Sequence, residues 1–471
     1  MHPRGVAKRA SSFRGGLVGA LVVGSLGCGE AAAPAGAGQG GATSPGAAGV
    51  AVAGSAGPTN GGHAGVAGQS PALGSSSGAG GVGGSNVAVG GSGAEVDTSG
   101  EIYDPEKFPR FDLELPPASV AALRLDPDTY VRGSLRYGDE VVADIGVRIK
   151  GEGSKRTLEE KAAFKLKFDE LVPKQSFHGL RRMTLNNMVE DPSFLAERLA
   201  FHFFRAQKLP APRCNSAQVY VNGEFFGVYA NVEAEDKTFL RRWFESDAGN
   251  LYEEGQVDFE PGKETAFDLE TNEEANDRSD LVALIAAVSG AKPASFMTDV
   301  GAQLDIAHFL AFTAAEAAVN QWDMYAYTVF YPNNFRIYRE PLAQKFVMLP
   351  WGMDMSMKPF RDTGKPHIRV FELAREGDFD DGKVTAGRIF QSCLNSPACR
   401  AAYVEVVKTT AAAYEAVDLR GLAEKYHAQI ASEVAKDPRK EYSAAEIETS
   451  YQSLLKTIRE RPARLRADAD E

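Results

Sequence analysis

The region from Glu101 to Glu471 lacks the short motifs that identify many enzyme classes. It contains no H-E-x-x-H, C-x-x-C, G-x-x-x-x-G-K-[ST] or G-x-G-x-x-G pattern, and the seven histidines of the chain are scattered. These patterns are typical of zinc hydrolases, thiol oxidoreductases, P-loop proteins and dinucleotide-binding folds. None of these chemistries therefore has direct support from a motif.

The N-terminal part of the chain lacks an apolar run long enough to cross a membrane. Residues 17–26 are apolar, whereas a membrane-spanning helix needs about 20 such residues. Four basic residues and no acid precede this run, and small residues follow it, as in a signal peptide. We therefore expect residues 1–28 to be a signal peptide. Cys28 would be a lipid attachment site that anchors the exported chain to the cell envelope, at the outer membrane or the cell surface.

The lipid anchor is one of two interpretations of this segment. The sequence Ser25-Leu26-Gly27-Cys28 resembles a bacterial lipobox, although a lipobox usually has leucine at the position of Ser25. In the alternative, the protein is simply secreted, and Cys28 is discarded or left unmodified.

Residues 29–100 contain no aromatic residue and hardly any large aliphatic residue. A stretch of Gly, Ala, Ser, Val and Pro cannot bury enough apolar surface to offset its backbone entropy. We expect a flexible linker with an r.m.s. span of roughly 45 Å. A single folded region, residues 101–471, would follow it.

Basic residues are in deficit, with 51 Lys and Arg against 63 Asp and Glu and a net charge of −12. Non-specific binding to nucleic acid needs a basic surface. We therefore expect no nucleic-acid partner.

Cysteine is scarce, with four residues in the chain. Cys393 and Cys399 stand close together, and in an oxidising compartment we expect them to form a small disulfide loop at a helix N-terminus. A metal site is the alternative, but it lacks a second His or Cys cluster nearby. Cys214 is expected to be a buried free thiol.

Apolar periodicity predicts strands in the first half of the folded region and helices in the second. The strongest local signal is Asn222-Gly223 between two apolar runs, which indicates a hairpin. Asp191-Pro192 is typical of a helix start. The other expected strands are 132–137, 141–150, 163–168, 183–185, 327–331, 335–338 and 345–349, and the expected helices are 193–208, 236–244, 281–288, 305–319, 401–416, 419–434 and 444–466. This order favours an α+β fold with a strand-rich N-terminal lobe, a mainly helical C-terminal lobe and a cleft between them.

Alternation in the strand at 163–168 places Lys165 and Lys167, together with the preceding Lys161, on one face. Three ammonium groups in a row favour a polyanion such as a chain of phosphates. The alternative is a solvated strand edge, where lysine guards against aggregation.

Two carboxylates stand at the ends of predicted elements. Asp323 follows a long apolar helix in Asn-Gln-Trp-Asp, and Asp354 follows an apolar strand in Pro-Trp-Gly-Met-Asp. Oxygen ligands of this kind suit Mg²⁺, Mn²⁺ or Ca²⁺, and an acid/base pair is equally compatible with them. Ordinary turn and helix-end chemistry is the alternative for either residue taken alone.

An ordered set of motifs resembles the CotH kinase family, the family of spore coat protein H. The set covers most of the folded region, from about Val141 to Lys358. Its members are Gly146-Val-Arg148-Ile-Lys150-Gly-x-Gly-Ser, Lys161-x-x-Phe-Lys165-Leu-Lys167-Phe, Asn186, Val221-Asn-Gly-Glu-x-x-Gly227-x-Tyr229, Glu233-x-x-Asp236-x-x-Phe-Leu, Asn320-x-x-Asp323, Asn334-Phe-x-x-Tyr338 and Pro350-Trp-x-x-Asp354.

This resemblance implies an atypical protein-kinase-like fold that transfers a phosphoryl group from ATP to Ser or Thr of surface or envelope proteins. Asp323 would orient and deprotonate the acceptor hydroxyl, and Asp354 would hold the metal ion, Mg²⁺ or Mn²⁺ with Ca²⁺ as a further candidate, with Asn334 completing the site. Glu233 would pair with a lysine as the kinase helix-C glutamate does. The cations expected at the nucleotide are Arg148, Lys150, Lys161, Lys165 and Lys167.

The chain departs from the family pattern at Gly352, where members usually carry the first acid of W-D-x-D. This departure, and the scarcity of ATP outside the cytosol, support a different class of function: a non-catalytic scaffold in envelope or coat assembly. A carbohydrate-binding surface built on Trp322 and Trp351 is a third possibility, although these aromatics are also what a core contains.

Overall fold

The computed structural model describes residues 97–328, 331–359, 367–373 and 386–471. The chain divides into Met1–Val87 and Ala88–Glu471, and every described residue belongs to the second unit. The predicted signal peptide, Cys28 and almost all of the predicted linker lie outside the described residues. In the part that is described, no helix combines the length and the apolar character that a membrane span requires.

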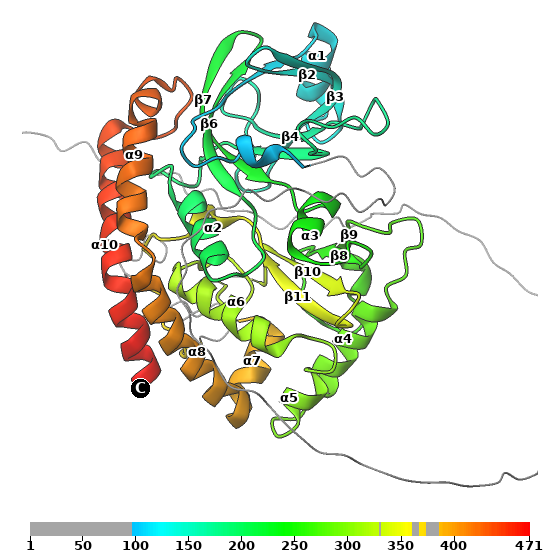
Figure 1. Ribbon diagram of the computed structural model, residues 1–471, viewed down its shortest axis with the longest axis vertical. Coiled ribbons are helices and arrows are strands. Elements are labelled where there is room, and N and C mark those ends of the chain that lie inside the picture. Colours follow the sequence, from blue (N-terminus) through cyan, green and yellow to red (C-terminus); the bar gives the residue numbers. More distant parts are fainter. Residues whose placement is uncertain (1–96, 329–330, 360–366, 374–385) are drawn as a thin grey trace, which may run out of the picture. The chain divides into compact units, whose positions relative to one another are not determined.

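Seven strands close into a barrel in the order β1-β2-β3-β4-β5-β7-β6 (Figure 1). The first and the sixth strand pair in parallel and so close the barrel. All other pairs of neighbouring strands in the barrel are antiparallel. Aliphatic and aromatic side chains fill its own core. The strands are β1 (Arg110–Glu114), β2 (Val131–Tyr137), β3 (Glu140–Lys150), β4 (Ala163–Lys167), β5 (Arg182–Asn186), β6 (Cys214–Val221) and β7 (Glu224–Glu233), and the short helices beside them are η1 (Ser99–Glu101) and α1 (Pro117–Leu125).

The predicted hairpin joins β6 to β7. Asn222 and Gly223 have φ angles of 51° and 80°, as a two-residue turn with positive φ at both positions requires. The expected strands at 132–137, 141–150, 163–168 and 183–185 are confirmed as β2 to β5, whereas β1 and the closure of the barrel were not predicted.

The apolar helix expected at 193–208 is α2 (Ala196–Ala206), which is almost entirely buried. It begins later than predicted, because Phe194 has a φ of 60° and breaks the helical path. Asp191 nevertheless acts at this end of the helix, since its carboxylate accepts a hydrogen bond from the Ala196 N–H at 2.8 Å.

A second sheet has the strand order β11-β10-β8-β9. Its strands are β8 (Leu251–Glu253), β9 (Asp268–Leu269), β10 (Phe335–Glu340) and β11 (Lys345–Pro350), and its neighbours in the chain are α3 (Lys237–Trp243), η2 (Glu264–Ala266), α4 (Ser279–Gly290), α5 (Phe296–Asp299), α6 (Ile306–Ala318) and η3 (Met353–Met355). The described residues of the strand expected at 327–331 form no extended strand, and residues 329–330 lie outside the description.

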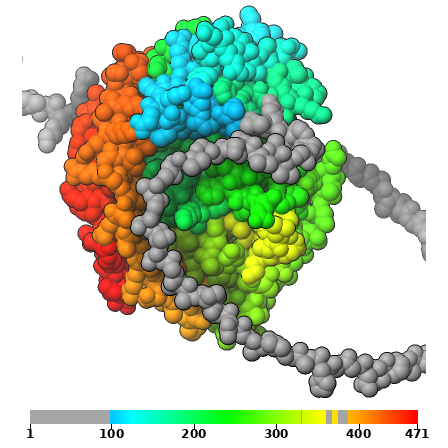
Figure 2. Space-filling model, viewed as in Figure 1, coloured from blue at the N-terminus to red at the C-terminus, as the bar shows by residue number. Residues whose placement is uncertain are grey.

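Four helices complete the described chain: α7 (Arg388–Asn395), α8 (Pro397–Ala416), α9 (Leu419–Lys436) and α10 (Ala444–Asp470). Of the last three, α10 lies beside both α8 and α9 (Figure 1). In Figure 2 the blue residues that precede the barrel border the orange of α9, where the Gln429 side chain donates to the carbonyls of Pro105 and Lys107.

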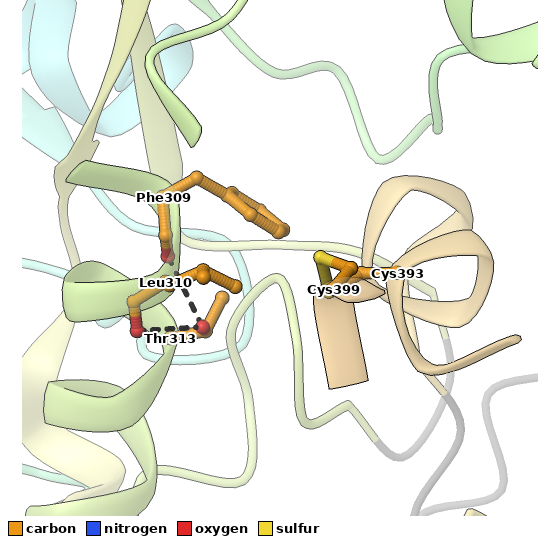
Figure 3. Close-up of a disulfide and its surroundings, with 5 residues drawn as sticks. All are labelled: Phe309, Leu310, Thr313, Cys393 and Cys399. Atoms are coloured by element: carbon orange, nitrogen blue, oxygen red, sulfur yellow. Dashed lines mark hydrogen bonds between the residues drawn. A yellow bond between two sulfur atoms is a disulfide. The ribbon is translucent and has the colours of Figure 1, made fainter. Parts of the chain in front are cut away.

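The predicted disulfide is confirmed. Cys393 and Cys399 are joined where α7 ends and α8 begins, and both residues are 0% exposed. Phe309 of α6 directs its ring toward this bond (Figure 3). Cys214 is a buried free thiol, also as predicted. The structure thus confirms the mixed α and β architecture and adds a closed barrel to it.

Candidate active site

The last residue of β3 and the last residue of β5 meet beside the first turn of α2. The Lys150 ammonium donates to Asn186 Oδ1 at 2.6 Å. The Asn186 amide donates in turn to both carboxylate oxygens of Glu197, each at 2.9 Å. Asn186 thus connects a lysine of the barrel with a glutamate of a buried helix.

Asp354 adds a second carboxylate to this group. It lies in η3, which packs against α2, and its negative charge favours the protonated form of Glu197 and the charged form of Lys150. Burial, together with the charge of Asp354, raises the pKa of Glu197 to about 8. Burial lowers the pKa of Lys150.

Asp323 lies in the loop after α6 and is held by two asparagines of the loop before β10. Asn334 Nδ2 donates to the Asp323 main-chain carbonyl at 2.7 Å and to its carboxylate at 3.0 Å. The Asn333 amide lies 3.4 Å from the same carboxylate. Burial raises the pKa of Asp323 to about 6, helped by the charge of Asp354 and opposed by the two asparagines and Lys358.

The charge of Asp354 therefore acts on the Asp323 carboxylate, although 30 residues lie between them in the sequence. The structure brings together the two carboxylates that the sequence singled out. Asp354 is half-buried, and its carboxylate forms no hydrogen bond with any residue of the described ranges. Within those ranges no hydrogen-bond donor competes with a ligand for this carboxylate.

The residues present can hold a divalent cation only together with ligands from the substrate. Within the described ranges, no three His, Cys, Asp or Glu side chains are grouped closely enough to hold a metal ion by themselves. Mg²⁺, however, is usually held by one or two carboxylates together with phosphates of the substrate. The open carboxylate of Asp354 suits that arrangement. The amide nitrogen of Asn334 is bound to Asp323, so Oδ1 is the side-chain atom that would bind a metal ion. The metal-binding role of Asn334 therefore stays a prediction.

A polar cavity of about 560 Å³ lies next to this group. Its wall includes one face of β3, β4 and β5, where Arg148 is paired with Lys165 and Lys167 with Arg182 in the sheet register. Residues from outside the barrel complete the lining, among them Glu235, Asp268, Glu270, Arg278, Arg336 and Trp351. Like charges that face each other across strands are unfavourable without an anion between them.

Lys165 is the cation of this wall with the fewest partners. Within the described residues it forms no hydrogen bond and no ion pair, and burial lowers its pKa to about 8. Its neighbours are better compensated, because Lys167 pairs with Glu170 at 2.7 Å and Arg182 with Glu270 at 2.8 Å. An anionic ligand in this cavity would stabilise the charged form of Lys165, which burial disfavours.

Trp351 lies between the cavity and the Lys150 group. It lines the cavity, while Lys150 Nζ lies 5.6 Å and Arg336 Cζ 4.7 Å from the centre of its ring. Arg336 is buried, forms an ion pair with Glu253 at 2.8 Å and lies 3.3 Å from the carboxyl group of Glu235. The cavity and the carboxylate group thus share one wall.

Two of the residues expected at the nucleotide lie elsewhere. Lys161 precedes β4, is 1% exposed and pairs with Asp437 at 2.6 Å, so it does not continue the face of Lys165 and Lys167. Glu233 pairs with two arginines, Arg213 at 2.7 Å and Arg242, and not with a lysine. The predicted lysine face is therefore wrong for Lys161 and the predicted lysine partner is wrong for Glu233, because long-range partners, which strand alternation does not reveal, bury these side chains.

Glu197 and Glu254 were missed by sequence reasoning. Glu197 lies in a helix whose apolar residues indicated only a core, and a carboxylate at the start of such a helix was the available signal. Glu254 follows β8, and its Oε1 accepts the Asn334 N–H at 3.0 Å, while its buried Oε2 has no hydrogen-bond partner among the described residues. Glu197 is connected with Lys150 through Asn186.

The chain is similar to two curated proteins and to a solved structure. The inner spore coat protein H of Bacillus subtilis is 24% identical over 190 residues, which cover 38% of this chain and 51% of that protein. The match thus spans about half the length of this relative. The inner spore coat protein H-like protein of the same organism is 23% identical over 316 residues, with 67% and 87% covered. Among solved structures, the Helicobacter pylori proinflammatory kinase CtkA matches with 12% identity and a TM-score of 0.30, over 72% of this chain and 91% of that one.

The family model described as CotH kinase protein matches residues 147–465. This range begins in β3, ends in α10 and contains Lys150, Glu197, Asp323 and Asp354. The chain therefore belongs to the CotH kinase family and is a kinase-type protein.

Proposed function

We propose that this protein is an exported, ATP-dependent protein kinase that phosphorylates Ser or Thr of surface or envelope proteins. The observation that supports this function best is the convergence of Asp323, Asp354 and Lys150 beside a cavity with cations on its barrel wall. Phosphoryl transfer needs little more than alignment, charge stabilisation and one carboxylate for the hydroxyl proton.

In this proposal the fold is a two-lobed kinase. The barrel forms the N-terminal lobe, the second sheet and the helices α4 to α10 form the C-terminal lobe, and the nucleotide binds in the cavity that both parts line. Arg148, Lys165 and Lys167 lie on its barrel wall. They offset phosphate charge together with Lys150.

Asp323 acts as the base. Its raised pKa keeps the carboxylate basic enough to take a proton from a hydroxyl while leaving it ionised at neutral pH. Asn333 and Asn334 hold the carboxylate in place. A divalent cation on Asp354, Mg²⁺ or Mn²⁺ and less suitably Ca²⁺, supplies charge neutralisation at the phosphates when bound.

Export and anchoring are proposed from the sequence alone. The basic start, the short apolar run and Cys28 support a lipid-anchored protein that reaches its substrates on a long linker. The buried Cys393–Cys399 disulfide suits an oxidising compartment. The partners would be an envelope protein and the membrane, with no nucleic acid.

One observation favours a second function. The acid that usually follows the tryptophan in this family is Gly352, so the metal site has fewer carboxylates than expected. A scaffold that keeps the kinase fold without catalysis would tolerate that loss.

Incubation with ATP labelled at the γ-phosphate and Mg²⁺ or Mn²⁺ tests the proposal. We expect label transfer by the wild type and loss of transfer in Asp323→Asn and Asp354→Asn. Glu405→Gln, which changes a carboxylate that is 72% exposed on α8, is the matched control and should behave as wild type. Equal transfer by all four proteins would overturn the site assignment. No transfer and no nucleotide binding with any of the cations would support the scaffold.

A further inference from the structure

The side chain of Asn334 occupies the space that a side chain at position 352 would need. A Cβ atom built on Gly352 would lie 2.1 Å from Asn334 Oδ1 and 2.6 Å from Asn334 Cγ. Real Cβ atoms essentially never come closer to another atom than 3.0 Å. An acid at position 352 and Asn334 in its present rotamer therefore exclude each other.

The backbone of Asn334 is held on both sides. Its N–H donates to Glu254 Oε1 at 3.0 Å, and its carbonyl accepts the Trp351 N–H at 3.0 Å. Its φ of 52° lies in the left-handed region, which asparagine tolerates better than other residues with a side chain. Any movement forced by a side chain at 352 would therefore fall on the Asn334 amide.

That amide is bound to Asp323. It donates both to the main-chain carbonyl and to the carboxylate of Asp323, at 2.7 and 3.0 Å. Two bonds from one amide fix the distance and the rotation of the carboxylate relative to its own backbone. Rotating the amide away from residue 352 would break at least one of them.

We propose that Asn334 is the positioning residue of Asp323, and that the Asn334 amide, in the rotamer that holds Asp323, leaves room only for glycine at position 352. An acid at position 352, as in the family pattern, would require another rotamer of the asparagine. The inference rests on the proposed function only where it gives Asp323 a catalytic role; the steric relation between Gly352 and Asn334 does not depend on it.

A double-mutant cycle on stability tests the steric relation without any assay of activity. We expect Gly352→Ala to lower the Tm strongly in the wild type and much less in the Asn334→Ala background. Gly138→Ala is the matched control, because Gly138 has a φ of 58° and nothing lies within 4 Å of a Cβ built on it. It reports the cost of the left-handed backbone alone. Equal effects of Gly352→Ala and Gly138→Ala, additive with Asn334→Ala, would overturn the steric relation.

Kinetics of the same proteins test the positioning role. We expect Asn334→Ala to lower kcat by about 10- to 100-fold, as for a misplaced catalytic group, with little change in KM for ATP. Gly352→Ala should lower kcat similarly, and the double variant should be no worse than either single one. Gly352→Asp should also lower kcat.

Three results would contradict the positioning role: additive losses, a loss confined to KM, or a gain in kcat or Mn²⁺ affinity in Gly352→Asp. The last result would identify residue 352 as a lost metal ligand. If the wild type transfers no phosphoryl group, the proposed function fails and the positioning role fails with it, while the stability cycle still decides whether Asn334 and Gly352 are coupled.

Discussion

The Lys161 ammonium lies 2.6 Å from the Asp437 carboxylate, and the two side chains are 1% and 0% exposed. Asp437 also accepts the Val228 N–H at 3.0 Å, and a Cβ at Gly227 would lie 2.2 Å from its Oδ2. The end of α9 therefore inserts a carboxylate into the barrel wall. Lys161 and Gly227, which belong to the family pattern, contribute to this packing.

Breaking this pair should destabilise the fold without a direct effect on the nucleotide site. We expect Lys161→Met or Asp437→Asn to cost about 3–5 kcal/mol, because the remaining charge is left buried and unpaired. Urea unfolding measures the loss. Lys436→Met, which removes an ammonium that is 65% exposed, should cost no more than about 1 kcal/mol. Full stability with lost ATP binding in Lys161→Met would restore Lys161 to the nucleotide site.

Lys150 and Lys165 should both contribute to nucleotide affinity. We expect Lys150→Met and Lys165→Met each to weaken ATP binding by about tenfold or more, because a charged hydrogen bond is worth about 1.5–3 kcal/mol. Titration calorimetry measures the affinity. Lys408→Met, on the outer face of α8, is the control and should bind as wild type. Unchanged affinity in both Lys150→Met and Lys165→Met would place the nucleotide elsewhere.

The pH dependence of the reaction should report the ionisation of Asp323. Since the base must be ionised, kcat/KM should rise with pH through about 6, the raised pKa of Asp323. Asn333→Ala should move this midpoint upward, because it removes a donor to the carboxylate. Asp354→Asn should move it downward in whatever activity remains, because it removes a nearby negative charge. A midpoint that neither change moves would belong to another group.

Glu235 should make the fold less stable as the pH rises. Burial raises the pKa of Glu235 to about 8 from a usual value near 4.5, so the folded state holds a proton that the unfolded state releases. The contribution is complete below about pH 4.5 and is lost as the pH rises to about 8, by at most about 1.4 kcal/mol per pH unit.

Glu235→Gln keeps the shape without the titration, so its unfolding free energy should depend less on pH over this window than that of the wild type. Unfolding by urea at pH 5, 6.5 and 8 gives the comparison. Parallel curves for the two proteins would show that Glu235 is ionised in the folded state.

The disulfide should support the packing of α7 and α8 against α6. Its loop is short, with a sequence separation of six residues, so chain entropy assigns it about 2 kcal/mol. We expect Cys393→Ser with Cys399→Ser to lower the Tm, and dithiothreitol to lower the Tm of the wild type but not of the double variant. Cys214→Ser leaves the disulfide intact, so this variant should retain its response to dithiothreitol.

Local chemistry along the chain determines much of this protein. The Asn222-Gly223 turn, the alternation that places Lys165 and Lys167 on one face, and the disulfide of Cys393 and Cys399 all follow from residues close together in the chain. The carboxylates Asp323 and Asp354 were recognised from their places at the ends of apolar elements. Such features depend on side-chain period and turn geometry, which a sequence displays directly.

Tertiary structure decided which of these residues share a site. Lys161 and Glu233 have partners that alternation and spacing do not reveal and do not line the cavity, whereas Glu197 is linked to Lys150 through Asn186. The fold also placed the Asn334 amide against Gly352, at the position where the family pattern has an acid. Burial, ion pairing and steric exclusion depend on atoms that only the folded chain brings together.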